Sequence, residues 1–335
     1  MGKQTVTDTA AERVEILAYP REDQHTAFAR DVAAGLRRSP KSLSCRFLYD
    51  AAGSLLFEEI CAQPEYYVMR AEAEILQAHA PELASILGPK IAFVELGSGS
   101  GVKTRIIIDA LLAAGTQLTW VPVDISRSAL VESARGMSAE FEALQVTGVA
   151  GEYERGIEWI ADHPRCAKLV AFLGSNIGNY TRDAAAELLC SVRAAMTADD
   201  RLLLGIDLRK DAAVLAAAYD DAKGVTARFN KNLLERINSE LGGTFDTSLF
   251  DHSAIYDGKT GCVSSGLIAR RAHTVRITEL DLDVSFGADE CIHTENSVKY
   301  SLDEIDEVAR RAGLRVERRW LDGKARFSLN LLTPL

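Results

Sequence analysis

The chain has 335 residues, of which 47% are hydrophobic and 26% charged, an ordinary composition for a soluble globular protein with a large core. Its net charge of −10 argues against nucleic-acid binding, because contact with the phosphate backbone requires a basic surface. The six cysteines and six histidines are scattered without C-x-x-C or H-x-x-x-H spacing, so we expect reduced cysteines and no metal site.

The first residues, MGKQTVTDTA, contain no apolar stretch of the kind found in signal peptides. No apolar run approaches the roughly 18 residues that a membrane span needs. We therefore expect a cytoplasmic protein that contacts neither membrane nor nucleic acid, and we expect it to be a monomer.

Residues 11–69 are expected to be mainly helical.

Short apolar runs alternate with amphipathic stretches from about Ile91 onward. The expected strands are 91–96, 118–123, 144–150, 168–174 and 201–206, and the expected helices are 103–115, 126–141 and 181–196. This alternation predicts βαβ units on a parallel sheet that is covered on both faces. The predicted fold class is a doubly wound, Rossmann-like α/β fold.

The C-terminal segment predicts one more helix and a β-hairpin on the same sheet. Ser301 and Glu304 have the spacing of a capping box, and Gly313 is placed to end the helix. Two strand-like runs, 314–320 and 326–332, flank a turn and form the expected hairpin.

Two segments do not follow the α/β rhythm. Residues 210–297 begin with two helical stretches and become strand-like around the turn DGKTG. We expect them to join the N-terminal segment in a discontinuous α+β substrate domain. The expected division is 70–209 with 298–335 for the cofactor domain, and 11–69 with 210–297 for the substrate domain.

The loop VELGSGSGVKT follows the first α/β strand and begins a helix, where parallel sheets bind their ligands. A P-loop requires Gly directly before Lys-Ser/Thr, but Val102 stands there. A dinucleotide fingerprint requires G-x-G-x-x-G, whereas Gly97, Gly99 and Gly101 are spaced G-x-G-x-G, so NAD stays only as an alternative. The spacing that begins at Glu95 resembles the first motif of class I methyltransferases and favours S-adenosylmethionine (SAM).

Further polar residues stand at the ends of the next strands. Glu95 suits a cationic methionyl group, and Asp124 ends the second strand, where an acidic side chain binds ribose hydroxyls. Glu152 is placed to accept from the adenine amine, and Tyr153 to lie against the adenine ring. The structural alternatives are a tight glycine turn, a helix cap and ordinary loop residues. The stretch FLGSNIGNY, after the fourth strand, is locally either an elaborate turn or the floor of an active site.

Four stretches together resemble the histidine-specific, SAM-dependent methyltransferase family. They are FLYDAAGSLLFEEICAQPEYYVMRAEAEIL, ELGSGSGVKTR, FLGSNIGN followed by AYDDAKGVTARFNKNLL, and TENSVKYS. The resemblance runs from about residue 30 to the C-terminus. It implies SAM as cofactor, an amino acid as substrate, and trimethylation of the α-amine of histidine to hercynine, the precursor of ergothioneine.

The resemblance also implies roles for individual residues. Tyr66 and Asn179 would hold the amino-acid head group, Tyr219 its carboxylate, and Glu295 and Ser297 the imidazole nitrogens. The remaining positions are Gly174 in the same pocket, Tyr49 with Asn179 at the methyl-transfer site, and Glu95, Gly97, Ser98, Gly99, Lys103, Asp124, Glu152 and Tyr153 around the cofactor. Taken singly, each of the substrate residues is equally compatible with a core, cap or turn position.

One departure from the family concerns the substrate side chain. Ser265, in CVSSGLIA, stands where the histidine enzyme carries a methionine, which enlarges or wets the pocket. Methylation of tryptophan or a derived amine is therefore an alternative within the class. Outside it, the alternatives are an NAD-dependent oxidoreductase and a SAM-binding protein without turnover.

Overall fold

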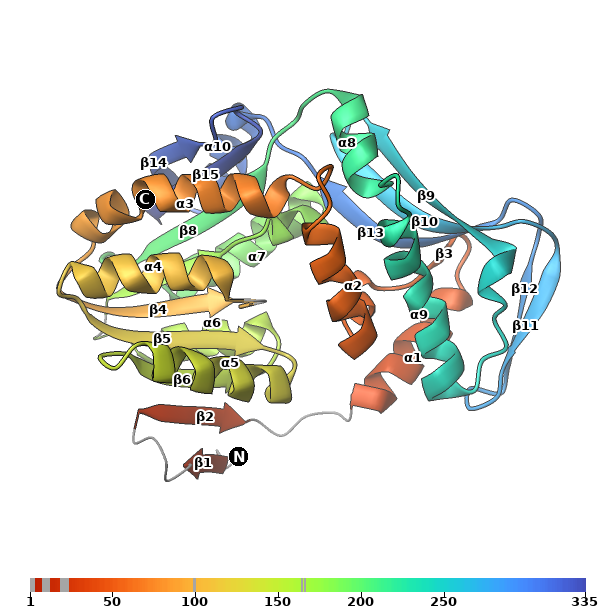
Figure 1. Ribbon diagram of the computed structural model, residues 1–335, viewed down its shortest axis with the longest axis horizontal. Helices are drawn as coiled ribbons and strands as arrows, with labels where there is room; N and C mark the ends of the chain where they lie inside the picture. Colours follow the sequence, from red (N-terminus) through yellow and green to blue (C-terminus); the bar gives the residue numbers. More distant parts are fainter. Residues whose placement is uncertain (1–3, 8–12, 19–23, 99–100, 164, 166) are drawn as a thin grey trace. The chain divides into compact units, whose positions relative to one another are not determined.

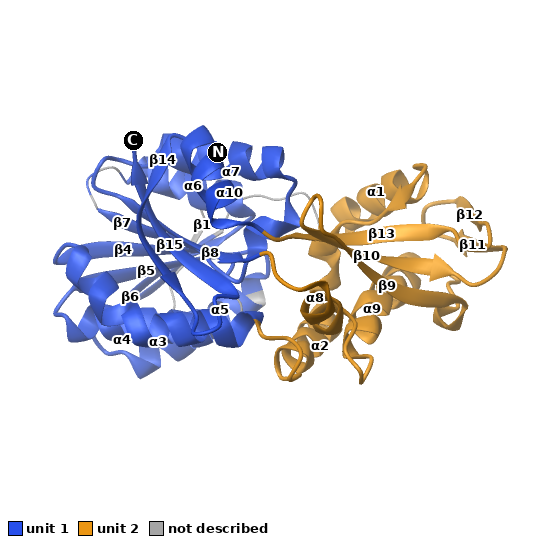
Figure 2. Ribbon diagram, turned by 90° about the horizontal axis from the view of Figure 1, so that it is seen from above, with its two compact units in different colours: residues 1–20, 68–208, 300–335 blue, residues 21–67, 209–299 orange. Residues whose placement is uncertain are grey.

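The computed structural model describes residues 4–7, 13–18, 24–98, 101–163, 165 and 167–335, and it contains two compact units. Unit 1 consists of residues 1–20, 68–208 and 300–335, and unit 2 of residues 21–67 and 209–299 (Figure 2). Each unit is assembled from segments that are distant in the sequence.

Unit 1 is built on one large sheet with the described strand order β1-β2-β6-β5-β4-β7-β8-β15-β14 (Figure 1). The strands are β1 (Gln4–Thr7), β2 (Val14–Ala18), β4 (Lys90–Leu96), β5 (Gln117–Asp124), β6 (Gln145–Ala150), β7 (Lys168–Phe172), β8 (Arg201–Asp207), β14 (Leu314–Leu321) and β15 (Phe327–Pro334). The run from β2 to β8 is parallel, and the β14–β15 hairpin joins β8 antiparallel. The predicted parallel sheet with a C-terminal hairpin is confirmed.

Helices cover both faces of this sheet. They are α3 (Val68–Ile86), α4 (Val102–Ala113), α5 (Arg127–Glu140), α6 (Tyr153–Asp162), α7 (Arg182–Ala195) and α10 (Leu302–Arg311). Figure 2 shows α3, α4 and α5 on one face and α6, α7 and α10 on the other. Because both faces are covered, the central strands are mostly apolar, and every residue of β7 is buried. The doubly wound α/β fold is therefore as predicted.

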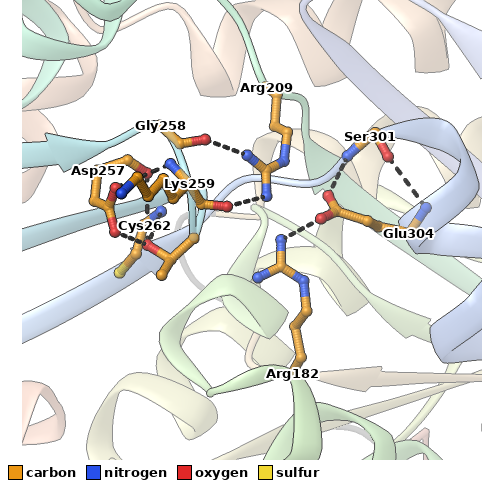
Figure 3. A network of polar contacts seen from close by, with 9 residues as sticks. Arg182, Arg209, Asp257, Gly258, Lys259, Cys262, Ser301 and Glu304 are labelled. Carbon is orange, nitrogen blue, oxygen red and sulfur yellow. Dashed lines mark hydrogen bonds and ion pairs between the residues drawn. The ribbon is translucent and has the colours of Figure 1, made fainter.

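The predicted capping box begins α10. Ser301 Oγ accepts the backbone N–H of Glu304 at 3.2 Å, and the Glu304 carboxylate accepts the backbone N–H of Ser301 at 2.8 Å (Figure 3). Arg182, at the start of α7, donates to the other oxygen of Glu304 at 2.8 Å. These bonds join the first turns of two helices on the same face of the sheet.

The N-terminal segment differs from the expectation. Residues 14–18 are not part of a helical substrate domain but form β2, which pairs parallel to β6 in unit 1. Ile16 and Leu17 are buried there, and the Cβ-free Gly148 of β6 leaves room for the Ile16 side chain. This pairing is non-local, so the short run VEILA does not reveal it. The unit boundaries otherwise lie within a few residues of those expected.

Unit 2 combines helices with a small sheet of described order β3-β13-β10-β9 and a hairpin, β11–β12. The elements are α1 (Gln24–Leu36), β3 (Lys41–Ser42), η1 (Cys45–Leu48), α2 (Ala51–Cys61), α8 (Ala212–Tyr219), α9 (Val225–Leu241), η3 (Thr247–Leu249), β9 (Phe250–Asp257), β10 (Cys262–Ala269), β11 (His273–Ile277), β12 (Leu282–Phe286) and β13 (Cys291–Val298). Helix α9 buries Phe229, Leu233 and Ile237. These side chains belong to one apolar core together with residues of α1, β9 and β10.

The predicted turn DGKTG connects β9 to β10. The guanidinium of Arg209 donates to the carbonyl oxygens of Gly258 at 2.8 Å and of Lys259 at 3.3 Å (Figure 3). Gly261 has φ +73°, and its carbonyl accepts the backbone N–H of Lys299 at 2.7 Å. The first and last residues of the 209–299 segment are thus fixed to this one turn.

Candidate active site

The glycine loop of unit 1 begins directly after β4. Gly97 has φ +83°, a conformation that glycine adopts without strain, and its N–H donates to the Val123 carbonyl at 3.0 Å. A Cβ at Gly97 would lie 3.4 Å from Tyr153 Oη and 3.6 Å from Asn176 Nδ2. Gly97, Tyr153 and Asn176 therefore meet at the carboxyl edge of the sheet. Ser98 follows and is buried, whereas the predicted cofactor residue Gly99 lies outside the described residues.

Three other predicted cofactor residues lie on the same edge. Asp124 is the last residue of β5, and its Oδ1 accepts the backbone N–H of Ser126 at 2.8 Å. Glu152 is exposed at the N-cap of α6, directly after β6. Tyr153 is the first residue of α6 and packs edge-on against Phe172 at 5.2 Å between ring centroids. The ends of β4, β5 and β6 thus present the glycine, acid and aromatic groups in the predicted order.

Glu95 is in the interior of unit 1. Its carboxylate accepts from Thr104 Oγ1 at 2.9 Å and from Trp120 Nε1 at 3.2 Å, and the residue is 2% exposed. Burial raises the pKa of Glu95 to about 7, although the hydrogen bond from Thr104 and the charge of Lys103 oppose the shift. These contacts place Glu95 under the glycine loop, where it joins β4 to α4 and β5.

Lys103 is joined to a residue that sequence reasoning missed. Glu72, on α3, is fully buried, and its Oε2 accepts from Lys103 Nζ at 2.6 Å. The same carboxylate accepts the backbone N–H of Gly174 at 2.8 and 3.0 Å. A Cβ at Gly205 would lie 1.9 Å from Glu72 Oε1, so the neighbouring strand leaves room for this carboxylate. Nothing local in the helical sequence around Glu72 distinguishes it from a surface glutamate.

The stretch after β7 has an unusual backbone. Gly174 and Ser175 both have positive φ, +74° and +59°, and lead into the 3-10 turn η2 (Asn176–Asn179). Ser175 is buried, and its Oγ accepts the backbone N–H of Asp207 at 3.0 Å, which stabilises this strained conformation from the neighbouring strand β8. Asn179 ends the turn half-buried, and within the described residues its amide has no hydrogen-bond partner. The amide is therefore available to a ligand.

The residues predicted to contact the substrate side chain lie on one face of the unit 2 sheet. Ser265 of β10 is paired with Glu295 of β13, and Val263 with Ser297. Directly opposed residues of an antiparallel pair project to the same side, and so do residues two apart on one strand. Ser265, Glu295 and Ser297 therefore share a face. A register shift next to Ser265 makes Thr294 the extra residue of a bulge.

Aromatic rings accompany these residues in unit 2. Tyr49 contacts the rings of Phe57 and Phe229 edge-on at 5.3 and 5.4 Å. Tyr66 contacts Phe57 at 6.1 Å and Tyr219 at 6.3 Å. Tyr49 is 39% exposed as a whole residue, and burial of its phenol, followed by the charge of Glu295, raises the pKa of that phenol. The predicted tyrosines thus form one connected aromatic group.

Glu295 is the carboxylate within this group. Among the described residues it has neither a hydrogen-bond nor an ion-pair partner at its carboxylate. Burial raises the pKa of Glu295 to about 7, and the charge of Lys299 opposes the shift. Its charge in turn raises the pKa of Tyr66 and Cys45, in both cases after the larger effect of burial. Glu295 is half-buried, and its carboxylate can accept a hydrogen bond from water or from a bound ligand.

Lys299 is the second residue that sequence reasoning missed. It is fully buried one residue beyond β13, and its Nζ donates to Tyr219 Oη at 2.6 Å and to Ser297 Oγ at 2.8 Å. Those two oxygens are 2.7 Å apart and share a hydrogen bond. Two residues that the sequence assigned separately, Tyr219 and Ser297, therefore belong to one polar cluster.

The described residues contain neither a membrane-spanning helix nor a metal-binding cluster. Over those ranges no helix combines the length and apolar character needed to cross a membrane. Three or more His, Cys, Asp or Glu side chains are not grouped there in a way that would hold a metal ion.

Comparison with known proteins gives a consistent result. Residues 28–334 match the model of a family described as histidine-specific methyltransferase, SAM-dependent. The histidine N-alpha-methyltransferase of Mycobacterium tuberculosis (strain CDC 1551 / Oshkosh) is 41% identical over 95% of this chain and 99% of its own length. The histidine N-alpha-methyltransferase of Mycolicibacterium smegmatis is 40% identical over 91% of this chain and 94% of its own length. The L-tryptophan methyltransferase trpM of Psilocybe serbica is 27% identical over 89% of this chain and 90% of its own length.

Proposed function

The chain belongs to the family of histidine-specific, SAM-dependent methyltransferases, and we propose that it methylates the α-amine of L-histidine with SAM, forming the Nα-trimethyl product hercynine. The observation that carries the choice of substrate is the unpaired carboxylate of Glu295, on the same sheet face as Ser265 and Ser297. An imidazole N–H is a donor suited to such an acceptor, and a charge-assisted bond of this kind discriminates strongly.

The residues at the carboxyl edge of the unit 1 sheet fit SAM. Lys103 supplies an ammonium for the methionyl carboxylate, and its side chain is 13% exposed. Asp124 supplies a carboxylate for the ribose hydroxyls, and Gly97 lets the backbone approach closely. Glu152 and Tyr153 follow β6, and we assign them to adenine. SAM supplies the electrophilic methyl when bound; the protein residues bind and orient.

The roles in methyl transfer follow from what the amine requires. In-line displacement needs its lone pair to be free and aligned, and alignment provides much of the rate. We assign Asn179 and Tyr66 to hold the amine and Tyr219 to hold the α-carboxylate. Tyr49 offers an aromatic face, which tolerates the quaternary ammonium product through cation–π attraction. Solvent takes the proton of the amine, so no strong base is needed.

A tryptophan-type substrate is the second candidate. Ser265 is small and lies opposite Glu295, which leaves space for a ring larger than imidazole. An indole N–H also donates to a carboxylate, but indole has no ring nitrogen acceptor for a hydroxyl donor. We therefore place histidine first.

Turnover with single amino acids tests the proposal. The protein is incubated with SAM and either histidine or tryptophan, and S-adenosylhomocysteine and methylated products are followed by mass spectrometry. We expect histidine to gain up to three methyl groups and tryptophan to react at least about tenfold more slowly, the discrimination expected from one unpaired polar group. Methylation of tryptophan alone would replace the first candidate by the second.

A further inference from the structure

Helix α8 ends at Tyr219, the residue that we assign to the α-carboxylate of the substrate. The helix has eight residues, and its buried side chains are Leu215, Ala218 and Tyr219. A helix shorter than about 12 residues is marginal on its own in water, so it depends on tertiary contacts. The position of Tyr219 is therefore set by what anchors the end of α8.

His252 of β9 anchors the backbone at the end of α8. The last carbonyl groups of a helix have no partner within the helix, and the carbonyl of Tyr219 is one of them. Its oxygen lies 2.9 Å from His252 Nε2. A carbonyl oxygen can only accept, so Nε2 carries a proton and donates it. His252 is paired with Leu267 of β10 and therefore lies on the face of the sheet that packs on the apolar core.

Asn230 of α9 fixes the orientation of the His252 ring. Its Nδ2 lies 2.9 Å from His252 Nδ1 and 3.1 Å from the carbonyl oxygen of Gly266 in β10. An amide oxygen in this place would face the Gly266 carbonyl, acceptor against acceptor, so the nitrogen stands there and Nδ1 accepts from it. Asn230 is buried, and its Oδ1 has no hydrogen-bond partner in the described part of the chain. The side chain therefore acts through its NH2 group.

These contacts give Tyr219 a second fixed point. Its hydroxyl oxygen is held by Ser297 Oγ at 2.7 Å and by Lys299 Nζ at 2.6 Å, and its carbonyl oxygen is held by His252. The carbonyl bond belongs to a line of hydrogen bonds that runs from β10 through α9 and β9 to α8, which pack together in unit 2 (Figure 1). Fixing the backbone as well as the hydroxyl determines the direction of the Tyr219 ring.

We propose that Asn230 and His252 are positioning residues for substrate binding. His252 fixes the backbone of Tyr219, and Asn230 fixes the tautomer and the orientation of His252, so that the Tyr219 hydroxyl stays directed at the α-carboxylate. Neither residue needs to touch the substrate. This inference rests on the proposed function, although only on the binding of an α-amino acid. It also explains why the stretch AYDDAKGVTARFNKNLL contains both Tyr219 and Asn230.

A double-mutant cycle with Tyr219→Phe tests the coupling. Tyr219→Phe removes the hydroxyl but keeps the backbone carbonyl that His252 binds. His252→Leu removes the donor, whereas His252→Gln keeps an N–H donor and an oxygen acceptor in one side chain. The kcat/KM for histidine and the dissociation constant of SAM are measured for each His252 variant, with and without Tyr219→Phe.

His252→Leu should lower kcat/KM for histidine about tenfold, because the Tyr219 carbonyl loses the donor that His252 supplies and the hydroxyl is misplaced. His252→Gln should recover most of that loss. When Tyr219→Phe is already present, His252→Leu should cost less than about twofold more, since the group that it positions is absent. The dissociation constant of SAM should stay within about twofold throughout, the scatter expected for independent sites.

Asn238→Ala is the matched control for Asn230→Ala. Asn238 lies about two turns further along α9. It binds the backbone of Phe245, donating to the carbonyl and accepting from the N–H, each at 2.8 Å. Both variants should melt at lower temperature. Only Asn230→Ala should lower kcat/KM for histidine, by about threefold or more, and this loss should also disappear when Tyr219→Phe is present.

The outcomes separate the two proposals. If the wild type methylates no amino acid, the proposed function fails and the inference falls with it. If it methylates an amino acid other than histidine, the same cycle is run with that amino acid, which carries the same α-carboxylate. An equal loss from His252→Leu with and without Tyr219→Phe would assign His252 a purely structural role and overturn the inference alone. Should His252→Leu not fold, equal losses from Asn230→Ala in the two backgrounds would overturn it in the same way.

Discussion

Glu72 and Lys103 form an ion pair of 2.6 Å between Oε2 and Nζ, in which the Glu72 side chain is fully buried and the Lys103 side chain is 13% exposed. Because Glu72 also accepts the N–H of Gly174, one side chain of α3 orients both the first turn of α4 and the exit of β7. The edge of the sheet where we propose that SAM binds is therefore supported by Glu72, a residue that need not touch any ligand.

Glu72→Gln should weaken SAM binding. Its amide oxygen can still accept from Gly174, but its NH2 group would face the ammonium of Lys103, donor against donor. We expect the KM for SAM to rise about tenfold or more, the typical effect of losing a charged hydrogen bond, with little change in the KM for histidine. Steady-state kinetics with each substrate varied in turn measure both values.

Asp200→Asn is the matched control. Asp200 and Lys168 are another fully buried ion pair of unit 1, at 3.2 Å, but they lie where β7 and β8 begin, at the opposite edge of the sheet. Both variants should melt at lower temperature, and only Glu72→Gln should change the KM for SAM. A similar KM change in both would show that Glu72 acts through stability alone.

Gly174→Ala should impair the same edge. Gly174 has φ +74°, and an added Cβ would lie 3.2 Å from Lys103 Nζ. Gly115 has φ +79° with open space around the Cβ position, so Gly115→Ala carries the backbone strain alone. Each substitution should cost about 1 kcal/mol of stability. SAM binding by calorimetry should weaken only in Gly174→Ala; weakening in neither variant would remove Gly174 from the site.

Glu295→Ala should weaken histidine binding at least about tenfold, because a charged hydrogen bond contributes roughly 1.5–3 kcal/mol. SAM binding should stay within about twofold. Asp283→Ala removes an exposed carboxylate of the same unit and should change neither value. Binding of each ligand by calorimetry decides the matter, and an equal loss of both ligands in Glu295→Ala would disprove the side-chain role.

Glu95 predicts a pH dependence of stability. Burial raises its pKa from an ordinary value of 4.5 to about 7, so the folded state favours the protonated form. The contribution of this pKa shift to the free energy of unfolding is fully present below about pH 4.5. It is lost as the pH rises to about 7, by an amount on the order of 3 kcal/mol.

Glu95→Gln removes that ionisation. The Thr104 hydroxyl can reverse its hydrogen bond to accept from the new NH2 group, while Trp120 still donates to the amide oxygen. Urea unfolding at pH 5 and pH 8 should show a smaller difference in the variant than in the wild type. Identical differences in the two proteins would mean that Glu95 stays ionised when folded.

Much of unit 1 could be predicted from local sequence. The buried strands are continuous apolar runs, and the capping box of Ser301 and Glu304 needs only residues three apart. The exception is β2, whose partner β6 lies more than a hundred residues further along the chain, so its pairing leaves no local signal.

Residue type alone indicated where some site candidates lie, as for Gly97 at the positive-φ turn after β4 and Asp124 at the end of β5. The site was not predictable where burial creates the role. Glu72 and Lys299 are ordinary charged residues in the sequence, and only the packing of α3 and the end of β13 removes them from solvent. The signal that would have found Lys299 is its spacing of two and four residues from Ser297 and Glu295, which places all three on one strand face. Glu95 was assigned to the cofactor itself, whereas its contacts are internal.

The most direct measurement of the central claim is a competition experiment. The protein is given SAM and an equimolar mixture of histidine, tryptophan and the other common amino acids, and products are followed over time by mass spectrometry. We predict mono-, di- and trimethylated histidine in succession, with every other amino acid unchanged until histidine is consumed. Methylation of another amino acid ahead of histidine, or no methylated histidine at all, would contradict the account.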